Sequence, residues 1–148
     1  MWGKRGQHHQ AIGRSRGGIT SKIHTIVDAL GNPLRFVVTA GNLNDCSVGF
    51  EMLEEMDVSG KIVLADRGYD TDRIVDLLDE KKAICVIPSR MHRKVQRSYD
   101  WWLYKERHLV ECFFNKLKHY RRLATRYDKL AASFSAFLAL AACLVWIR

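Results

Sequence analysis

Two short runs of β-forming residues, separated by a helical period, constrain this 148-residue chain most strongly. KIVLAD (61–66) is followed by TDRIVDLLDEKK (71–82) and then by AICVIPS (83–89). Apolar residues recur three and four positions apart in the middle run, which is the spacing of a buried helical face. This stripe consists of Ile74, Leu77 and Leu78. The pattern predicts two short buried strands joined by a helix that Thr71 caps.

Further elements are predicted on both sides of this unit. SKIHTIVDAL, GNP and LRFVVTAG (21–41) alternate apolar and polar residues around a turn signal, which predicts a β-hairpin. Residues 45–56 read as a helix that Asn44 or Asp45 caps. Single helices are predicted over 104–122 and from 131 to the end. The order β-β-α-β-α-β-loop-α-α indicates an α/β sheet with packed helices.

Charge is unevenly distributed along the chain, whose net charge is +8. Residues 1–27 carry five basic residues and no acid. Residues 28–88 carry twelve acids and six basic residues, and residues 89–129 carry twelve basic residues and four acids. Basic flanks around an acidic centre suit a polyanion-binding site that contains metal-binding carboxylates. Ordinary surface charge is the alternative.

The remaining composition indicates a cytoplasmic protein. Its four cysteines have no zinc-binding spacing, lie among apolar neighbours and are expected to be reduced core residues. The amino-terminal segment 1–18 is polar, basic and rich in glycine, which predicts a flexible arm and not a signal peptide. The apolar tail is shorter than a membrane span requires, so we expect a buried terminal helix and no membrane contact.

Asp66 is the first candidate functional residue. It ends a predicted buried strand just before a glycine turn, and ligands of open α/β sheets bind at the carboxyl ends of strands. A carboxylate there is suitably placed to hold Mg²⁺. The alternative is that Asp66 caps the turn or pairs with Arg67.

The basic helix YKERHLVECFFNKLKHYRR (104–122) contains a second candidate, Glu111. At about 100° per residue, one continuous helix places Tyr104, Arg107, Glu111 and Lys118 within about 60° of one another. Such a face can join a metal-binding carboxylate to cations that hold phosphates. The alternative is a salt bridge between Arg107 and Glu111, which stabilises a helix only slightly.

These residues resemble those of a known family. The spacing Tyr104-x2-Arg107-x3-Glu111-x6-Lys118 is similar to the Y-x2-R-x3-E-x6-K signature of bacterial insertion-sequence transposases of the DDE type. LADRGYD resembles the block that carries the second catalytic aspartate of that family, which corresponds to Asp66. Residues 13–45 resemble the stretch that follows the first aspartate.

The resemblance implies a ribonuclease-H-like fold and two Mg²⁺ or Mn²⁺ ions held by three acids. It also implies DNA cleavage by water, followed by strand transfer to target DNA. Asp66 and Glu111 would then be metal ligands, and Tyr104, Arg107 and Lys118 would hold phosphates at the ends of the element.

The first aspartate of that family is not evident here. No D-[ST]-[ST] motif occurs in residues 1–18, and Asp28 and Asp45 resemble ordinary positions. We therefore expect residues 19–148 to be a partial catalytic domain that lacks the first, central strand and is the carboxyl-terminal part of a transposase. An upstream reading frame could complete it, and a full-length enzyme is expected to be a homodimer. The alternative is an inactive DNA-binding remnant or an interfering fragment.

Other residues are expected at the DNA interface. The basic loop 89–100 is predicted to contact phosphates, with a merely solvated loop as the alternative. Its candidates are Arg90, Arg93, Lys94 and Arg97. Arg121 and Arg122 extend the same basic surface. Trp102 is a candidate for stacking on a base, whereas adjacent tryptophans more often place one ring in the core.

Overall fold

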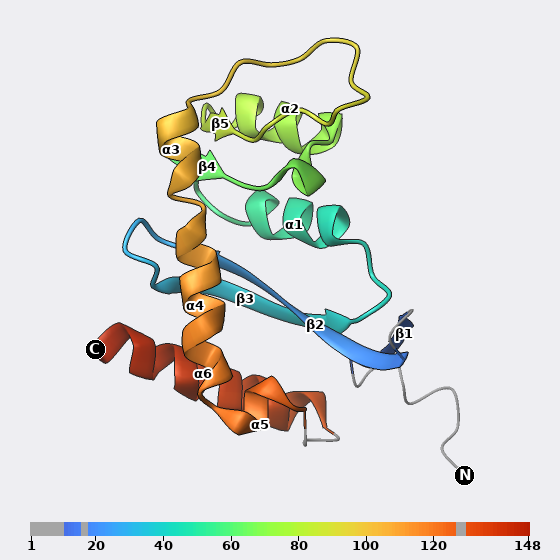
Figure 1. Cartoon of the computed structure of the whole chain (residues 1–148), viewed down its shortest axis with the longest axis vertical. Helices are drawn as coiled ribbons and strands as arrows, with labels where there is room; N and C mark the ends of the chain where they lie inside the picture. The colour runs from blue at the N-terminus through green and yellow to red at the C-terminus, as the bar shows by residue number, and fades with distance from the viewer. Residues whose placement is uncertain (1–10, 16–17, 127–129) are drawn as a thin grey trace. The chain divides into compact units, whose positions relative to one another are not determined.

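The structure, a computed structural model, describes residues 11–15, 18–126 and 130–148 (Figure 1). Its helices and strands make it a mixed α/β protein, as the sequence predicts. The chain divides into two units. Residues 1–43 with 109–148 are called the hairpin unit below, and residues 44–108 the βαβ unit.

The hairpin unit contains an antiparallel sheet of order β1-β2-β3. Its strands are β1 (Gly13–Ser15), β2 (Gly18–Val27) and β3 (Pro33–Ala40). The turn between β2 and β3 is closed by Asp28, whose Oδ1 accepts hydrogen bonds from the backbone N–H groups of Leu30 (2.8 Å) and Asn32 (2.9 Å). The predicted hairpin is therefore confirmed, and Asp28 has a local role in its turn.

Strand β1 lies within residues 1–18, where the sequence predicts a flexible basic arm. Gly13 pairs with Thr20, and Ser15 with Gly18, so this short segment satisfies its backbone groups on the edge of β2. The rest of the predicted arm, residues 1–10 and 16–17, lies outside the described residues.

Helices pack on one face of the hairpin. They are α4 (His108–Lys118), α5 (Arg121–Ala124) and α6 (Ala131–Ile147). Alternate residues of β2 and β3, which include Ile23 and Phe36, pack against a buried cluster from these helices. The cluster comprises Phe113, Leu117, Leu123, Phe134, Leu138, Ala141 and Val145. On the other face of the hairpin, His24 and Thr39 form a buried hydrogen bond of 2.8 Å.

The βαβ unit has the predicted order of elements. They are α1 (Asp45–Glu54), β4 (Ile62–Leu64), the 3-10 turn η3 (Arg67–Tyr69), α2 (Asp72–Glu80), β5 (Ile84–Val86) and α3 (Trp101–Lys105). Strands β4 and β5 pair in parallel. Asn44 and Thr71 cap α1 and α2 through side-chain oxygens that accept backbone N–H bonds, as the sequence predicts. The stripe of Ile74, Leu77 and Leu78 is buried.

Lys81 joins the two helices of this unit. Its Nζ donates to three backbone carbonyls at the end of α1, those of Leu53 (3.0 Å), Glu54 (2.5 Å) and Met56 (2.7 Å). The last carbonyls of a helix have no partners within it and carry a partial negative charge. One ammonium group at the end of α2 therefore provides a hydrogen-bond donor for the backbone carbonyls at the end of α1.

The two strands of the βαβ unit are less buried than the sequence suggested. Ile62 in β4 is 46% exposed, and Ile84 in β5 is 54% exposed. The prediction of fully buried strands is wrong at these positions, because β4 and β5 pair only with each other in the described residues. A two-stranded sheet leaves side chains and backbone edges open.

The predicted continuous helix 104–122 is interrupted twice. The helix begins earlier, at Trp101, and α3 ends at Lys105 before α4 starts at His108. Arg107 donates its backbone N–H to Tyr104, three residues back, at 3.1 Å. Such tight bonds replace the α-helical ladder and end the regular 100° rotation. The single-helix face proposed from the sequence therefore does not extend from Tyr104 to Lys118.

Two expectations about apolar residues are tested by burial. None of the four cysteines is buried: Cys46 and Cys85 are half-buried, and Cys112 and Cys143 are exposed. The expectation of core cysteines is thus wrong, because each side chain lies on a partly or fully exposed side of its helix or strand. No helix within the described residues is long and apolar enough to cross a membrane.

Replacing Phe113 by alanine should destabilise the hairpin unit by about 3–5 kcal/mol, because this fully buried ring fills the centre of the helix cluster. The measurement is the free energy of unfolding by chemical denaturation. Leu140→Ala is the matched control on the exposed side of α6, with an expected change within about 0.5 kcal/mol. Equal losses for both variants would contradict this assignment of the core.

Candidate active site

Asp66 lies two residues after the end of β4 and is the N-cap of the turn η3. Its Oδ1 accepts a hydrogen bond of 2.7 Å from the Gly68 N–H, and its side chain is exposed. The sequence left open whether Asp66 caps the turn or binds a ligand. The structure shows the cap, in which one carboxylate oxygen fixes the side chain at the carboxyl end of the strand.

The turn that carries Asp66 is held against α1. The Tyr69 ring occupies the space beside Gly49, where an added Cβ would lie only 2.7 Å from Tyr69 Cε1. Cys46 Sγ donates to the Gly68 carbonyl at 2.9 Å. Burial, together with the nearby charges of Asp45 and Asp66, raises the pKa of Tyr69 to about 12. The Tyr69 hydroxyl therefore stays neutral, and the turn rests on a fixed aromatic support.

Asp66 lines a cavity of about 480 Å³ within the βαβ unit. The other lining residues are Arg67, Gly68, Pro88, Tyr99, Trp101, Tyr104 and Arg107. The Tyr99 and Tyr104 rings meet edge to face with 5.4 Å between centroids, and the Arg107 guanidinium lies 5.7 Å from the Tyr104 ring centre. The cavity thus joins one carboxylate, two guanidinium-bearing side chains and aromatic walls.

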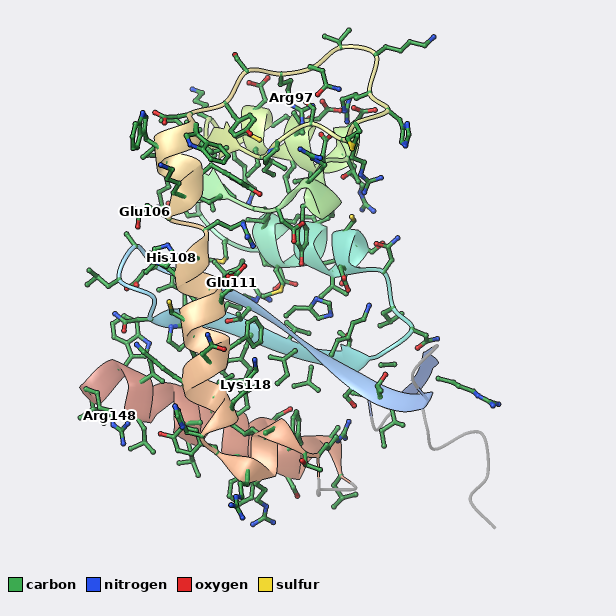
Figure 2. The ribbon with its side chains drawn as sticks, viewed as in Figure 1. Arg97, Glu106, His108, Glu111, Lys118 and Arg148 are labelled. Carbon is green, nitrogen blue, oxygen red and sulfur yellow. The ribbon has the colours of Figure 1, made fainter. Side chains whose placement is uncertain are left out.

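This cavity brings together residues that the sequence linked only by resemblance. Tyr104 and Arg107, the first half of the signature, line the same cavity as Asp66. Glu111 and Lys118, the second half, lie on α4 (Figure 2). Both are exposed, and their spacing of seven residues places them on the same face of that helix. The junction between the two units falls between Arg107 and Glu111.

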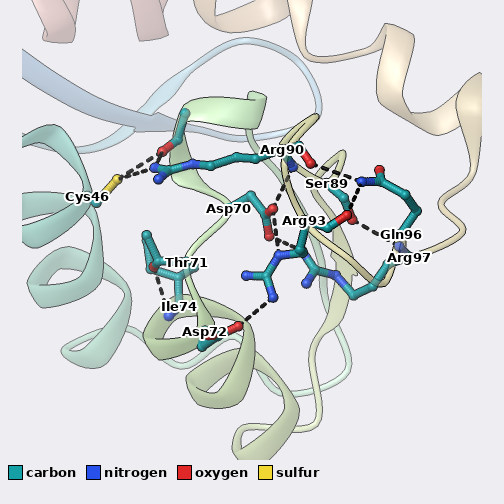
Figure 3. Close-up of polar contacts among 11 residues, drawn as sticks. Cys46, Asp70, Thr71, Asp72, Ile74, Ser89, Arg90, Arg93, Gln96 and Arg97 are labelled. Carbon is teal, nitrogen blue, oxygen red and sulfur yellow. Dashed lines mark hydrogen bonds and ion pairs between the residues drawn. The ribbon is translucent and has the colours of Figure 1, made fainter.

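A buried carboxylate, Asp70, organises the basic loop (Figure 3). Its side chain has no exposed surface and accepts hydrogen bonds from the Arg90 backbone N–H (2.7 Å) and the Arg93 Nε (2.9 Å). The Arg97 guanidinium forms a further ion pair with Asp70. Burial raises the pKa of Asp70, but the bonds from Arg90, Arg97 and Arg93 outweigh it and lower this pKa to about 2. Asp70 is therefore ionised at neutral pH.

Other bonds complete the folded loop. Arg93 also pairs with Asp72 at 2.6 Å, and the Arg97 N–H donates to Ser89 Oγ at 2.9 Å. The Gln96 side-chain amide donates to the carbonyls of Arg90 (3.0 Å) and Arg93 (2.8 Å). The loop has no helix or strand, as predicted, but side chains give it a defined conformation.

Sequence reasoning missed Asp70. The available signal was an acidic residue at the end of R-G-Y-D, followed about twenty positions later by three arginines within eight residues. Arg90, Arg93 and Arg97 were assigned to DNA, and the structure gives each an internal partner. Arg90 donates from Nη2 to the Gly68 carbonyl at 2.6 Å. Lys94, the fourth DNA candidate of the loop, is exposed.

The tryptophan pair differs from the commoner expectation of one buried ring. Trp101 is 55% exposed and Trp102 is 75% exposed, because α3 is short and its first turn lies at the surface. The Lys105 ammonium lies 4.0 Å from the Trp102 ring centre, a cation–π contact. On the hairpin unit, Arg121 and Arg122 are exposed, and Arg122 stacks over Phe137 at 3.9 Å.

The carboxylates differ in their suitability for a metal. Asp66 and Glu111 are exposed, whereas Asp70 is enclosed by arginines. Across residues 11–15, 18–126 and 130–148, no three histidine, cysteine or acidic side chains gather closely enough to hold an ion. The βαβ unit thus offers Asp66 as one accessible carboxylate beside cationic groups.

Comparisons with known proteins place the chain in a family. The family of transposase DDE domains matches residues 2–146. A Brucella ovis protein named as a transposase for insertion sequence element IS6501 is 40% identical over 131 residues, which cover 88% of this chain and 100% of that relative. A Burkholderia cepacia protein named as a transposase for IS402 is 31% identical, over 97% of this chain and 70% of that relative. No solved structure matches the chain.

The chain with this mixed α/β fold is therefore a protein of the transposase class. More specifically, the chain belongs to the DDE transposase family of bacterial insertion sequences.

Gly49→Ala should destabilise the βαβ unit by about 1–3 kcal/mol, because the added methyl group collides with the ring that supports the Asp66 turn. Alanine normally stabilises a helix relative to glycine. A loss of stability would therefore show that the added methyl group collides with the Tyr69 ring. The measurement is thermal and denaturant unfolding, with the exposed Glu51→Ala as the control in the same helix. A stabilised Gly49→Ala variant would show that Tyr69 does not occupy this space.

Asp70 should make stability depend on pH in the acid range. Its folded pKa of about 2 lies below the ordinary aspartate value of 3.8, so its contribution is fully present above about pH 4 and is lost as pH falls towards 2. This contribution is about 2 kcal/mol. The free-energy difference between wild type and Asp70→Asn should shrink across that interval, whereas the exposed Asp76→Asn should show little difference at any pH. A gap that is constant with pH would contradict the assigned pKa.

Proposed function

We propose that this chain supplies the DNA-binding surface and two of the three metal-binding carboxylates of a DDE transposase active site. One observation carries the proposal: Asp66 shares a cavity with Tyr104 and Arg107, which begin the signature that continues to Glu111. A carboxylate for the metal and a guanidinium for the phosphate are the two components that phosphoryl transfer requires in one place.

Asp66 and Glu111 are the proposed ligands of Mg²⁺ or Mn²⁺. Both are exposed, and carboxylate oxygens are the protein ligands that these ions prefer. The family chemistry uses two ions and a third carboxylate, which we assign to a D-[ST]-[ST] strand outside this sequence. When bound, the ions would activate the attacking oxygen and neutralise charge on the scissile phosphate.

The remaining side chains bind and orient the DNA. Arg107, with the Tyr104 ring beside it, holds a phosphate at the cavity, and the lining residue Arg67 adds a second guanidinium. Lys118, Arg121 and Arg122 contact further phosphates from the hairpin unit. Trp102 is sufficiently exposed to stack on an unpaired base.

The proposed fold of the complete enzyme is ribonuclease-H-like. The antiparallel hairpin and the parallel β4–β5 pair are the kinds of strand pairing that such a mixed sheet combines. The half-exposed strands β4 and β5 are what a sheet shows when a neighbouring strand is missing. The proposed partners are the inverted-repeat ends of the element, target DNA, a polypeptide from an upstream frame and a second copy of the complete enzyme.

The test is cleavage of a duplex that carries the terminal repeats of the element, in Mg²⁺ or Mn²⁺. The chain is combined with the polypeptide that an upstream frame encodes. Asp66→Asn and Glu111→Gln should each lower the cleavage rate by at least about 100-fold, because each removes a metal ligand. Asp79→Asn, an exposed acid on α2, is the matched control and should leave the rate unchanged.

Two outcomes would contradict the proposal. Retained cleavage by Glu111→Gln would remove the assigned ligand, and cleavage by this chain alone would refute the division of carboxylates. DNA binding is a separate readout, because Glu111→Gln should leave affinity unchanged or raise it slightly by removing a negative charge. Salt-dependent binding without cleavage under any combination would favour a binding-only remnant.

A further inference from the structure

The basic loop carries fewer available cations than its sequence suggests. Arg93 and Arg97 both pair with Asp70, and Arg93 pairs with Asp72 as well. The Arg90 guanidinium donates to the Gly68 carbonyl. Lys94 lies between the two arginines that are bound to Asp70, and it is exposed. The loop thus divides into two arginines that are paired with Asp70 and two exposed cations, Arg90 and Lys94.

A DNA phosphate would have to compete with Asp70 for these arginines. The Asp70 side chain is fully buried, so loss of a guanidinium would leave a buried negative charge with fewer partners. A phosphate contact at the exposed side of the loop gains less, because water and salt screen it. The low pKa of Asp70, set by the same bonds against the cost of burial, agrees with a firmly held anion.

We propose that Asp70 withholds Arg93 and Arg97 from DNA, so that Lys94, and not these two arginines, contacts phosphate from this loop. This inference rests on the DNA-binding function proposed above and narrows the residues that perform it. Asp70 is a positioning residue: it fixes the loop that leads from Ser89 to Asp100, the cap of α3. Since α3 carries Trp101 and Tyr104, the same carboxylate supports one wall of the cavity.

The salt dependence of DNA binding tests this division. Each phosphate neutralised by a protein cation contributes about 0.9 to the slope of log affinity against log salt concentration. Lys94→Gln should reduce the slope by about 0.9, whereas Arg93→Gln and Arg97→Gln should leave it unchanged. Lys82→Gln, an exposed lysine after α2, controls for the loss of one positive charge. A reduction of about 0.9 in either arginine variant would overturn the proposal.

Asp70→Asn should change the salt dependence of DNA binding in the opposite direction. Removing the carboxylate releases Arg93 and Arg97, so the slope should become steeper by up to about 1.8, which corresponds to two additional phosphate contacts. A purely structural role would lower the melting temperature without steepening the slope. An unchanged slope in folded Asp70→Asn protein, verified by circular dichroism at the assay temperature, would overturn the proposal.

A nuclear magnetic resonance titration gives a second readout that uses only the wild-type chain. The Arg93 Nε–H, which donates to Asp70, should keep its chemical shift when duplex DNA is added, whereas the Lys94 backbone amide should shift. Movement of the Arg93 signal during the titration would show that DNA takes this guanidinium and would overturn the proposal.

Failure of the proposed function is distinguishable from failure of this inference. If the wild-type chain shows no salt-dependent binding to duplex DNA, the DNA-binding function fails. Amide hydrogen exchange then tests whether Asp70 anchors the loop. Asp70→Asn should accelerate exchange at Arg90 and Arg97 by at least about tenfold, because the amide of Arg90 bonds Asp70 directly. Unchanged protection would overturn the anchoring role.

Discussion

The ion pairs of Asp70 connect the parts of the βαβ unit that the candidate site requires. The residue ends the sequence R-G-Y-D, so the turn that begins with Asp66 leads directly to a buried carboxylate. That carboxylate binds Arg93 and Arg97 from a loop with no regular secondary structure. The loop then continues into α3, whose side chains form a wall of the cavity. One buried charge thus links the catalytic candidate to the residues that face it.

Local sequence patterns predicted most of the secondary structure because each depends on near neighbours. The alternation in residues 21–40, the stripe on α2 and the caps at Asn44 and Thr71 all appear as expected. The break after Lys105 was not predictable in this way, because no glycine or proline marks it. It depends on tight backbone bonds at Glu106 and Arg107, which apolar periodicity does not reveal.

Three of the candidate site residues lie together, and the sequence did not predict the geometry that joins them. Motif spacing identified Asp66, Tyr104 and Arg107, and the structure places all three at one cavity. The sequence linked Asp66 to them by resemblance, and the single helical face expected to continue from Tyr104 to Lys118 is interrupted between α3 and α4. Tyr104 and Arg107 lie beside Asp66 because α3 follows the loop that Asp70 anchors. The position of α3 therefore depends on a carboxylate that is far from it in the sequence.

Charge counted along the sequence overstates the charge that a polyanion meets. Residues 89–129 carry twelve basic residues and four acids, yet two of those arginines are paired with Asp70, which belongs to the acidic central segment. The acidic segment therefore has two physical roles. Its exposed Asp66 is available to a cation, whereas its buried Asp70 uses cations of the basic segment to build the loop. Burial decides between these roles, because only a carboxylate removed from water requires permanent counter-charges.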